Sequence, residues 1–244
     1  MDEMTAAIAE LDERLKNVSF DFAFLGGSVL SLLINDPSVD SVRVTKDVDI
    51  IVDVRTRKDF HAEERELEAL GFRHDTREGA PICRWLVGDL AVDVLPVREE
   101  VLGWHSKWFD AALDTAQMLK VGNRQVKVVS APFFVALKLE AFEDRGQSDF
   151  LCSTDFEDVI CLFNGRPGIV EEILSEPTVG AGIANKFAEY VKSDDLEDAV
   201  LGFVQTESNP EVRFDLIMSA FRRLASGHPS QGPVTSPLGT RRIP

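Results

Sequence analysis

The chain has 244 residues, of which 44% are hydrophobic and 28% are charged, with 16 glycines, 11 prolines and 3 cysteines. This is the composition of a globular protein, and it excludes collagen-like, intrinsically disordered and disulfide-scaffold classes. The formal net charge of −16 argues against broad, sequence-independent binding to nucleic acid, although it leaves room for a local basic groove.

The first residues of the sequence and its hydropathy indicate where in the cell we expect the protein. Residues 1–16 carry several acidic side chains and lack the basic and apolar regions of a secretory signal, so we expect a cytoplasmic protein. No stretch approaches about 18 uninterrupted apolar residues, so we expect no membrane partner. No CxxC motif or Cys/His cluster is present, and we expect reduced, mostly buried thiols at Cys83, Cys152 and Cys161.

Residues 1–130 mix helical and strand patterns. Apolar spacing predicts a helix over 5–17, and the aromatic segment 20–25 predicts a buried strand. The turn Gly26-Gly27-Ser28 then leads into a short helix over 29–34 with Ser28 as its N-cap. Further along, composition and turn residues predict a loop over 35–44, a strand over 48–54, a helix over 57–70, and two hairpins formed by 82–87 with 90–95 and by 117–121 with 125–129.

After residue 130 the pattern becomes all-helical. Helical periodicity recurs over 132–145, 154–163, 168–174, 178–191, 196–204 and 210–225. Residues 226–244 are rich in Pro, Gly and Ser and offer too little apolar surface to offset the entropy of ordering. We therefore expect an α+β fold with a first domain over 1–130, an all-helical part over 131–225 that completes the site, and a disordered tail over 226–244.

Asp47 and Asp49 lie two residues apart, at the start of the strand predicted over 48–54. The side-chain period of two puts Asp47 and Asp49 on one face, with Val48 and Ile50 in the core. Two acids on one face are stable together chiefly when a cation lies between them, and oxygen ligands alone select a hard ion such as Mg²⁺. Solvated strand-end acids remain the alternative interpretation.

A third acid and the glycine turn complete the candidate site. Asp93 lies in an otherwise apolar strand, where an unpaired buried carboxylate would cost several kcal/mol, so it needs a partner. The turn Gly26-Gly27-Ser28 leaves backbone N–H groups and a hydroxyl free to hold phosphate oxygens at the start of a helix. An ordinary strand-to-helix turn is the alternative for these three residues.

These residues resemble the nucleotidyltransferase superfamily with a DNA-polymerase-β-like palm, whose pattern is strand, Gly-Gly/Ser, helix, Asp-x-Asp strand and a later Asp. The string Arg43-Val44-Thr45-Lys46-Asp47-Val48-Asp49-Ile50 is similar to that of AbiEii-type nucleotidyltransferase toxins. The same subgroup carries a K-[apolar]-x-A helix and a D-[apolar]-x-D helix, matched by Lys138-Leu139-Glu140-Ala141 and Asp155-Phe156-Glu157-Asp158. The resemblance covers roughly residues 20–165 and departs from the pattern in a longer 28–47 connection and an enlarged 145–155 segment.

The resemblance implies an N-terminal mixed sheet with flanking helices and Mg²⁺-dependent transfer of a nucleotidyl group from an NTP to a hydroxyl, with release of pyrophosphate. In such a site Asp47, Asp49 and Asp93 would bind one or two Mg²⁺ ions, and Asp93 would accept the hydroxyl proton. The catalytic set would also include Lys138 and Asp158. The nucleotide would be bound by Gly26, Gly27, Ser28, Thr45 and Lys46.

The helical residues can also be interpreted without the family. Phe134, Lys138, Ala141 and Arg145 share one helix face, so Lys138 is either a phosphate clamp or a lysine whose stem covers apolar surface. Asp155 and Asp158 lie at the border of the next helix's buried stripe. Asp155 suits a first-turn acid favoured by the helix dipole, and Asp158 is the better functional candidate.

The sequence is consistent with more than one acceptor for the nucleotidyl group. The resemblance implies an RNA or tRNA acceptor for a toxin with a cognate antitoxin protein, and Lys120, Arg124 and Lys127 with Arg43 and Lys46 could form a basic rim for it. A small molecule such as an aminoglycoside is the alternative acceptor. A non-catalytic nucleotide-binding or partner-binding module is the alternative outside enzymes.

Overall fold

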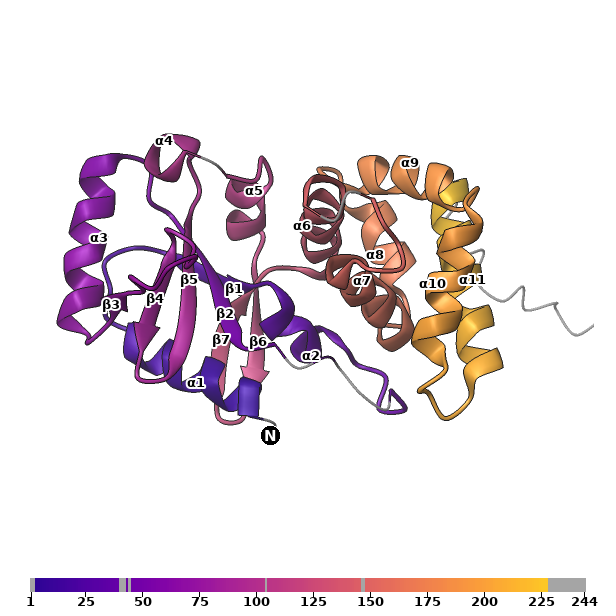
Figure 1. The fold of residues 1–244 in the computed structure, drawn as a ribbon, viewed down its shortest axis with the longest axis horizontal. Helices are drawn as coiled ribbons and strands as arrows, with labels where there is room; N and C mark the ends of the chain where they lie inside the picture. The colour runs from indigo at the N-terminus through magenta and orange to yellow at the C-terminus, as the bar shows by residue number, and fades with distance from the viewer. Residues whose placement is uncertain (1–2, 40–42, 44, 104, 146–147, 228–244) are drawn as a thin grey trace, which may run out of the picture.

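The computed structural model describes residues 3–39, 43, 45–103, 105–145 and 148–227. Within these residues the fold is α+β, as expected, with a sheet-containing N-terminal half beside an all-helical C-terminal half (Figure 1). Seven strands form one mixed sheet in the order β3-β4-β5-β2-β1-β7-β6. The strands are β1 (Phe22–Leu25), β2 (Asp47–Val52), β3 (Arg73–His74), β4 (Arg84–Val87), β5 (Leu90–Pro96), β6 (Gln117–Val121) and β7 (Arg124–Val128).

The centre of the sheet combines antiparallel and parallel pairs. Strand β2 is antiparallel to β1 and parallel to β5, and β1 is parallel to β7. The two predicted hairpins form as β4–β5 and β6–β7. The helices of this half are α1 (Glu3–Leu15), a 3-10 turn (Gly27–Val29), α2 (Leu30–Leu33), α3 (Arg57–Ala69), α4 (Glu99–Leu102) and α5 (Phe109–Asp114).

Every described element after β7 is a helix, as the periodicity predicts. The change from strand to helix falls at residues 129–130, between β7 and α6. Helices α6 and α7 form the side of the helical half that faces the sheet, and α9 to α11 lie beyond them (Figure 1). The helices are α6 (Ala131–Asp144), α7 (Thr154–Gly165), α8 (Ile169–Ser175), α9 (Gly180–Tyr190), α10 (Asp194–Val204) and α11 (Pro210–Ser226).

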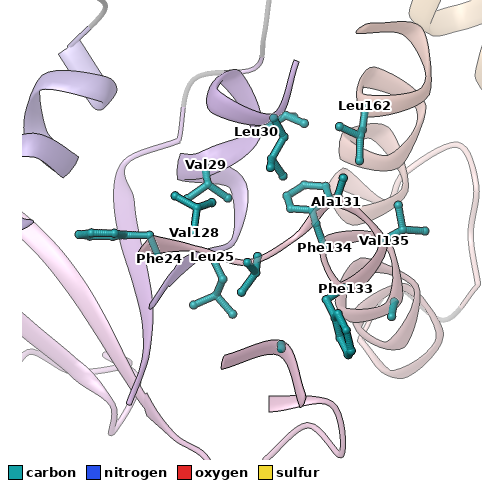
Figure 2. Packing of buried hydrophobic residues seen from close by; sticks show 14 of the residues in the cluster. Phe24, Leu25, Val29, Leu30, Val128, Ala131, Phe133, Phe134, Val135 and Leu162 are labelled. Carbon is teal, nitrogen blue, oxygen red and sulfur yellow. The ribbon is translucent and has the colours of Figure 1, made fainter. Parts of the chain in front are cut away.

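One hydrophobic core runs through both halves. Figure 2 shows side chains of β1, β7 and the 3-10 turn next to those of α6 and α7. Phe24 and Val128 on adjacent strands are fully buried, as are Phe133 on α6 and Leu162 on α7. Because burial of large apolar side chains is the main favourable term in folding, this shared core fixes α6 against the end of the sheet.

The loop after α2 is held to the helical half by polar contacts. The backbone N–H groups of Asn35 and Asp36 both donate to the carbonyl of Gly165, at 2.9 and 3.0 Å. A Cβ at Gly165 would lie 2.7 Å from Ile34, so glycine permits this close approach. Arg213 of α11 is only 8% exposed and forms an ion pair of 2.9 Å with Asp36. These contacts bring the segment that precedes Arg43 onto α7.

Several local features differ from the sequence-based expectations. The segment after β1 begins as a 3-10 turn whose N-cap is Gly26, and Ser28 lies inside it, so the prediction of Ser28 as N-cap is wrong. Strand β3 and helices α4 and α5 were not expected, because none exceeds six residues and such lengths give no clear periodicity. Of the tail predicted over 226–244, Ser226 ends α11 and residues 228–244 lie outside the described residues.

Two expectations from composition can be compared with the described residues. In that part of the chain no helix is both long enough and apolar enough to cross a membrane. Cys83 and Cys161 are buried, as expected, and burial raises the pKa of both thiols to about 12. Cys152 is exposed.

Helix α3 carries an unusual buried acid. Glu63 is 2% exposed, and neither carboxyl oxygen has a hydrogen-bond partner among the described residues. Burial, with smaller contributions from Glu64 and Glu66, raises the pKa of Glu63 to about 8. The folded state therefore binds a proton at neutral pH that the unfolded state releases near its usual pKa. Stability should fall as pH rises from about 4.5 to about 8.

Replacement of this acid by its neutral isostere tests that assignment. Glu63→Gln should raise the melting temperature at pH 8 by at least roughly 2–4 °C, which corresponds to about 1 kcal/mol, and should change it little at pH 5. The matched control is Glu68→Gln on the exposed side of the same helix, which should shift neither. An equal effect of Glu63→Gln at both pH values would contradict the raised pKa.

Candidate active site

The three candidate aspartates lie on one face of the sheet. In the parallel ladder Asp49 is directly opposite Asp93, and Asp47 lies two residues earlier on β2. Val48 and Ile50 point to the other face and are both fully buried. The predicted common face of Asp47 and Asp49 is therefore confirmed, and the register adds Asp93 to it.

The glycine turn closes over this face. Gly26 has φ of +72°, a left-handed conformation that side chains other than glycine rarely adopt. A Cβ at Gly26 would lie 1.9 Å from Oδ2 of Asp49, well inside contact distance. Gly26 is thus required both for its backbone conformation and for the approach of the Asp49 carboxylate.

Arg84 is the partner that Asp93 needs. It is the first residue of β4 and lies opposite Asp93 in the antiparallel hairpin. Its Nε donates to Oδ1 of Asp93 at 2.7 Å and its Nη2 donates to Oδ2 at 2.8 Å. The same Nη2 donates to Oδ2 of Asp47 at 2.6 Å. The guanidinium of Arg84 therefore binds the carboxylates of both Asp93 and Asp47.

The hydrogen bonds of Arg84 go to Asp93 and Asp47 and leave out the third carboxyl, Asp49. Burial, together with the negative charges of Asp47 and Asp93, raises the pKa of Asp49 to about 7. Within the described residues no group of three or more His, Cys, Asp or Glu side chains is arranged around a common metal position. The donor chemistry nevertheless fits a hard divalent cation, because three carboxylates share a face and a cation, Arg84, already lies between two of them.

The residues expected to bind nucleotide lie around the same carboxylates. Thr45 donates from its hydroxyl to Oδ1 of Asp47 at 2.9 Å, and Lys46 is exposed. A Cβ at Gly27 would be 3.3 Å from Nη2 of Arg43 and 3.5 Å from Oδ2 of Asp158, so this glycine faces the Arg43–Asp158 ion pair. Ser28 differs from the expectation of a free hydroxyl, because it is 1% exposed and donates to the carbonyl of Leu25 at 3.0 Å.

A second charged group links α6, α7 and the loop before β2. Nζ of Lys138 lies 2.9 Å from Asp155 and 2.6 Å from Asp158. Arg145 forms two hydrogen bonds with Asp155, at 2.9 and 3.0 Å. Arg43 likewise donates twice to Asp158, at 3.2 and 3.1 Å. Three cations and two carboxylates thus alternate in one chain of ion pairs.

The ion pairs favour the charged forms of Lys138 and Asp155 although both side chains are buried. Burial opposes the charged form of Lys138, but Asp158 and Asp155 outweigh it and raise the pKa of the ammonium. Burial also opposes ionised Asp155, and hydrogen bonds from Arg145 with the charge of Lys138 lower its pKa. The Arg43 end of this chain of ion pairs lies next to Gly27, where a Cβ would be 3.3 Å from Nη2 of Arg43 and 3.5 Å from Oδ2 of Asp158.

A cleft of about 390 Å³ lies between the aspartate face and α6. Asp49 and Asp93 form part of its floor, and the predicted α6 face of Phe134, Lys138, Ala141 and Arg145 forms one wall. Asp155 lines the cleft, whereas Asp158 does not and is only 1% exposed, so Asp155 is nearer to any ligand in it. The remaining lining residues are Leu25, Gly26, Pro81, Cys83, Leu95, His105, Ser106, Phe109, Leu137, Glu140 and Asp144.

Sequence reasoning missed Arg84, although a signal for it was present. The hairpin predicted around Gly88-Asp89 pairs residue 87 with 90, and counting outward places 84 opposite Asp93. The contribution of α5 was out of reach, because Phe109 comes from a six-residue helix with no recognisable period. The alternation of Arg43, Asp158, Lys138, Asp155 and Arg145 depends on tertiary packing and leaves no mark in local sequence.

Comparisons with known proteins find several similar solved structures. No protein-family model and no curated protein matches the chain. An antigenic nucleotidyltransferase-like protein from Paracoccidioides brasiliensis is 21% identical, with 91% of this chain and 93% of that chain covered and a TM-score of 0.49. The antibiotic-resistance factor ANT(2'')-Ia is 14% identical, with 78% and 96% covered and a TM-score of 0.49. At these values the assignment of the site rests on its own residues.

The close approach of Gly26 and Asp49 yields a stability test. Gly26→Ala should lower stability by more than the roughly 1–2 kcal/mol of a left-handed alanine, because its Cβ also collides with Asp49. Gly88→Ala is the matched control, since Gly88 has φ of +60° and open space around its Cβ position. Combining Gly26→Ala with Asp49→Ala should reduce the loss that Gly26→Ala causes, because the carboxylate that its Cβ meets is gone, as measured by urea unfolding. Additive losses in this double-mutant cycle would refute the contact.

Proposed function

We propose that this protein transfers a nucleotidyl group from an NTP to an acceptor hydroxyl. The observation that carries the proposal is the set of three aspartates on one sheet face beside a glycine turn, two of which, Asp49 and Asp93, line the floor of a cleft. In this reaction the hydroxyl oxygen bonds to the α-phosphorus, the bond to the oxygen bridging the α- and β-phosphates breaks, and pyrophosphate leaves. The hydroxyl proton passes to a carboxylate, for which we propose Asp93.

Asp47, Asp49 and Asp93 would hold Mg²⁺, which supplies positive charge to the reacting phosphate and to the entering and leaving oxygens. The chain's own residues would position the substrate. The backbone of Gly26 and Gly27 would face the phosphates, and Lys138 and Arg145 would balance triphosphate charge from the opposite wall. Asp158 would act as a positioning residue, because it touches Arg43 and Lys138 and lies outside the cleft.

For the acceptor we propose a small hydroxyl compound instead of RNA. The basic rim considered for RNA is largely neutralised, because Arg124 pairs with Glu13 and Lys127 pairs with Asp21, both at 2.5 Å. Since β7 runs parallel to β1, Arg124 at its start lies at the opposite end from Gly26. The cleft wall itself carries Glu140 and Asp144, which would repel a phosphodiester chain.

A labelling assay tests the proposal. The protein with Mg²⁺ and each of four α-labelled NTPs should label a member of a panel of small polyhydroxy compounds, aminoglycosides included, and leave total tRNA unlabelled. Asp49→Asn should reduce labelling at least about 10²-fold, because the charge that stabilises the transition state is lost. Asp89→Asn, which makes the same change in the exposed turn of the neighbouring hairpin, should retain full activity.

Three outcomes would count against the proposal. Absence of transfer from every NTP, or full activity in Asp49→Asn, would refute nucleotidyl transfer at this site. Labelling of tRNA that falls steeply between about 50 and 200 mM salt and is lost in Lys120→Glu with Lys127→Glu would refute the small acceptor and favour RNA.

A further inference from the structure

The aspartate face already contains a cation of its own. The fork of Arg84 makes two hydrogen bonds with Asp93 and one with Asp47, all between 2.6 and 2.8 Å. The three polar atoms of Asp47 and Asp93 that it occupies are carboxylate oxygens, the same atoms that a divalent cation would need. The Arg84 side chain is 23% exposed, and those of Asp47 and Asp93 are 33% and 11% exposed.

This arrangement explains how Asp47 and Asp93 can share one sheet face. Neighbouring carboxylates repel one another, and removal from water adds to the cost of each charge. A planar guanidinium suits two converging carboxylates because its N–H groups point in fixed directions. Arg84 thus keeps Asp47 and Asp93 converging on a common position between β2 and β5.

Arg84 and a divalent cation cannot both occupy this position. They would compete for the same oxygens, and two cations at such short separation repel each other. Arg84 can withdraw, because its long side chain is partly exposed and its strand β4 lies near the edge of the sheet, whereas the short side chains of Asp47 and Asp93 belong to the central strands β2 and β5. The backbone hydrogen bonds between β4 and β5 hold the strand in register without the guanidinium.

We propose that Arg84 is a displaceable counter-cation for the aspartate face: it holds Asp47 and Asp93 together before metal arrives, and a divalent cation binds only by displacing it. This inference rests on the proposed function, in which these aspartates hold the metal. Arg84 then lowers the affinity for metal alone while preserving the geometry of the ligands. It acts as a positioning residue and makes no contact with substrate in this role.

The test measures binding of Mn²⁺ alone to the full chain, without nucleotide, by electron paramagnetic resonance of the free ion. Arg84→Gln should bind Mn²⁺ at least about 10-fold more tightly than the unaltered protein. Its melting temperature should be lower without metal, and the gap should close at saturating Mn²⁺. The matched control is Arg77→Gln, which removes an arginine that pairs with Asp75 and not with the aspartate face. It should leave Mn²⁺ affinity unchanged.

A milder variant keeps the test decisive if Arg84→Gln does not fold. Arg84→Lys keeps the charge but lacks the fork that joins two carboxylates, so it should bind Mn²⁺ more tightly than the unaltered protein. A Mn²⁺ affinity of the Arg84 variants that equals or falls below that of the unaltered protein would overturn the counter-cation role of Arg84. The proposed nucleotidyl transfer would still stand if Asp49→Asn abolishes labelling. Absence of Mn²⁺ binding from every variant, together with absence of transfer, would overturn both.

Discussion

The mutual repulsion of three carboxylates on one sheet face is the constraint on which the rest of the site depends. Strand register alone brings Asp49 opposite Asp93, with Asp47 one step along the same face. The fold then offsets this repulsion with cations from two directions. Arg84 approaches from β4, within the sheet, and Lys138 with Arg145 approaches from α6 across the cleft. This charge distribution suits the ligand that we propose, a metal cation together with phosphate anions.

The shared core explains why the cleft has a defined shape. Phe24 and Val128 of the sheet pack in the same cluster as Phe133 of α6, so the wall and the floor belong to one packed unit (Figure 2). The chain of ion pairs runs along the same junction, from Arg43 before β2 to Arg145 at the end of α6. Loss of Lys138, the buried cation that joins Asp155 to Asp158, would divide this chain of ion pairs in two and leave two buried carboxylates with one partner each.

Much of the fold could be predicted from sequence because its signals are local. The hairpins follow from Gly88-Asp89 and Gly122-Asn123, and the helices after residue 130 follow from apolar periodicity. The order of the sheet strands could not be obtained in this way, since the pairing of β1 with β7 joins segments about a hundred residues apart and depends on tertiary packing.

In the candidate site, too, only the features with a local signal could be predicted from the sequence. The strand period predicted the common face of Asp47 and Asp49, and a helical period predicted the face of α6 that lines the cleft. The period could not show that Ser28 would turn its hydroxyl to Leu25, because a buried donor takes the nearest free carbonyl. It also ranked Asp158 above Asp155, whereas depth along a helix does not decide which acid reaches a cleft formed by another element.

The central claim is that the aspartate face is a site for a metal and a nucleotide, held ready by Arg84. A crystal structure with Mn²⁺ and a non-hydrolysable NTP analogue tests it most directly, because anomalous scattering locates the metal independently of the protein model. The account predicts a Mn²⁺ peak within coordination distance of Asp47 and Asp49, phosphates beside Gly26 and Gly27, and Arg84 withdrawn from Asp47. A metal and nucleotide bound elsewhere, with Arg84 still bridging Asp47 and Asp93, would contradict it.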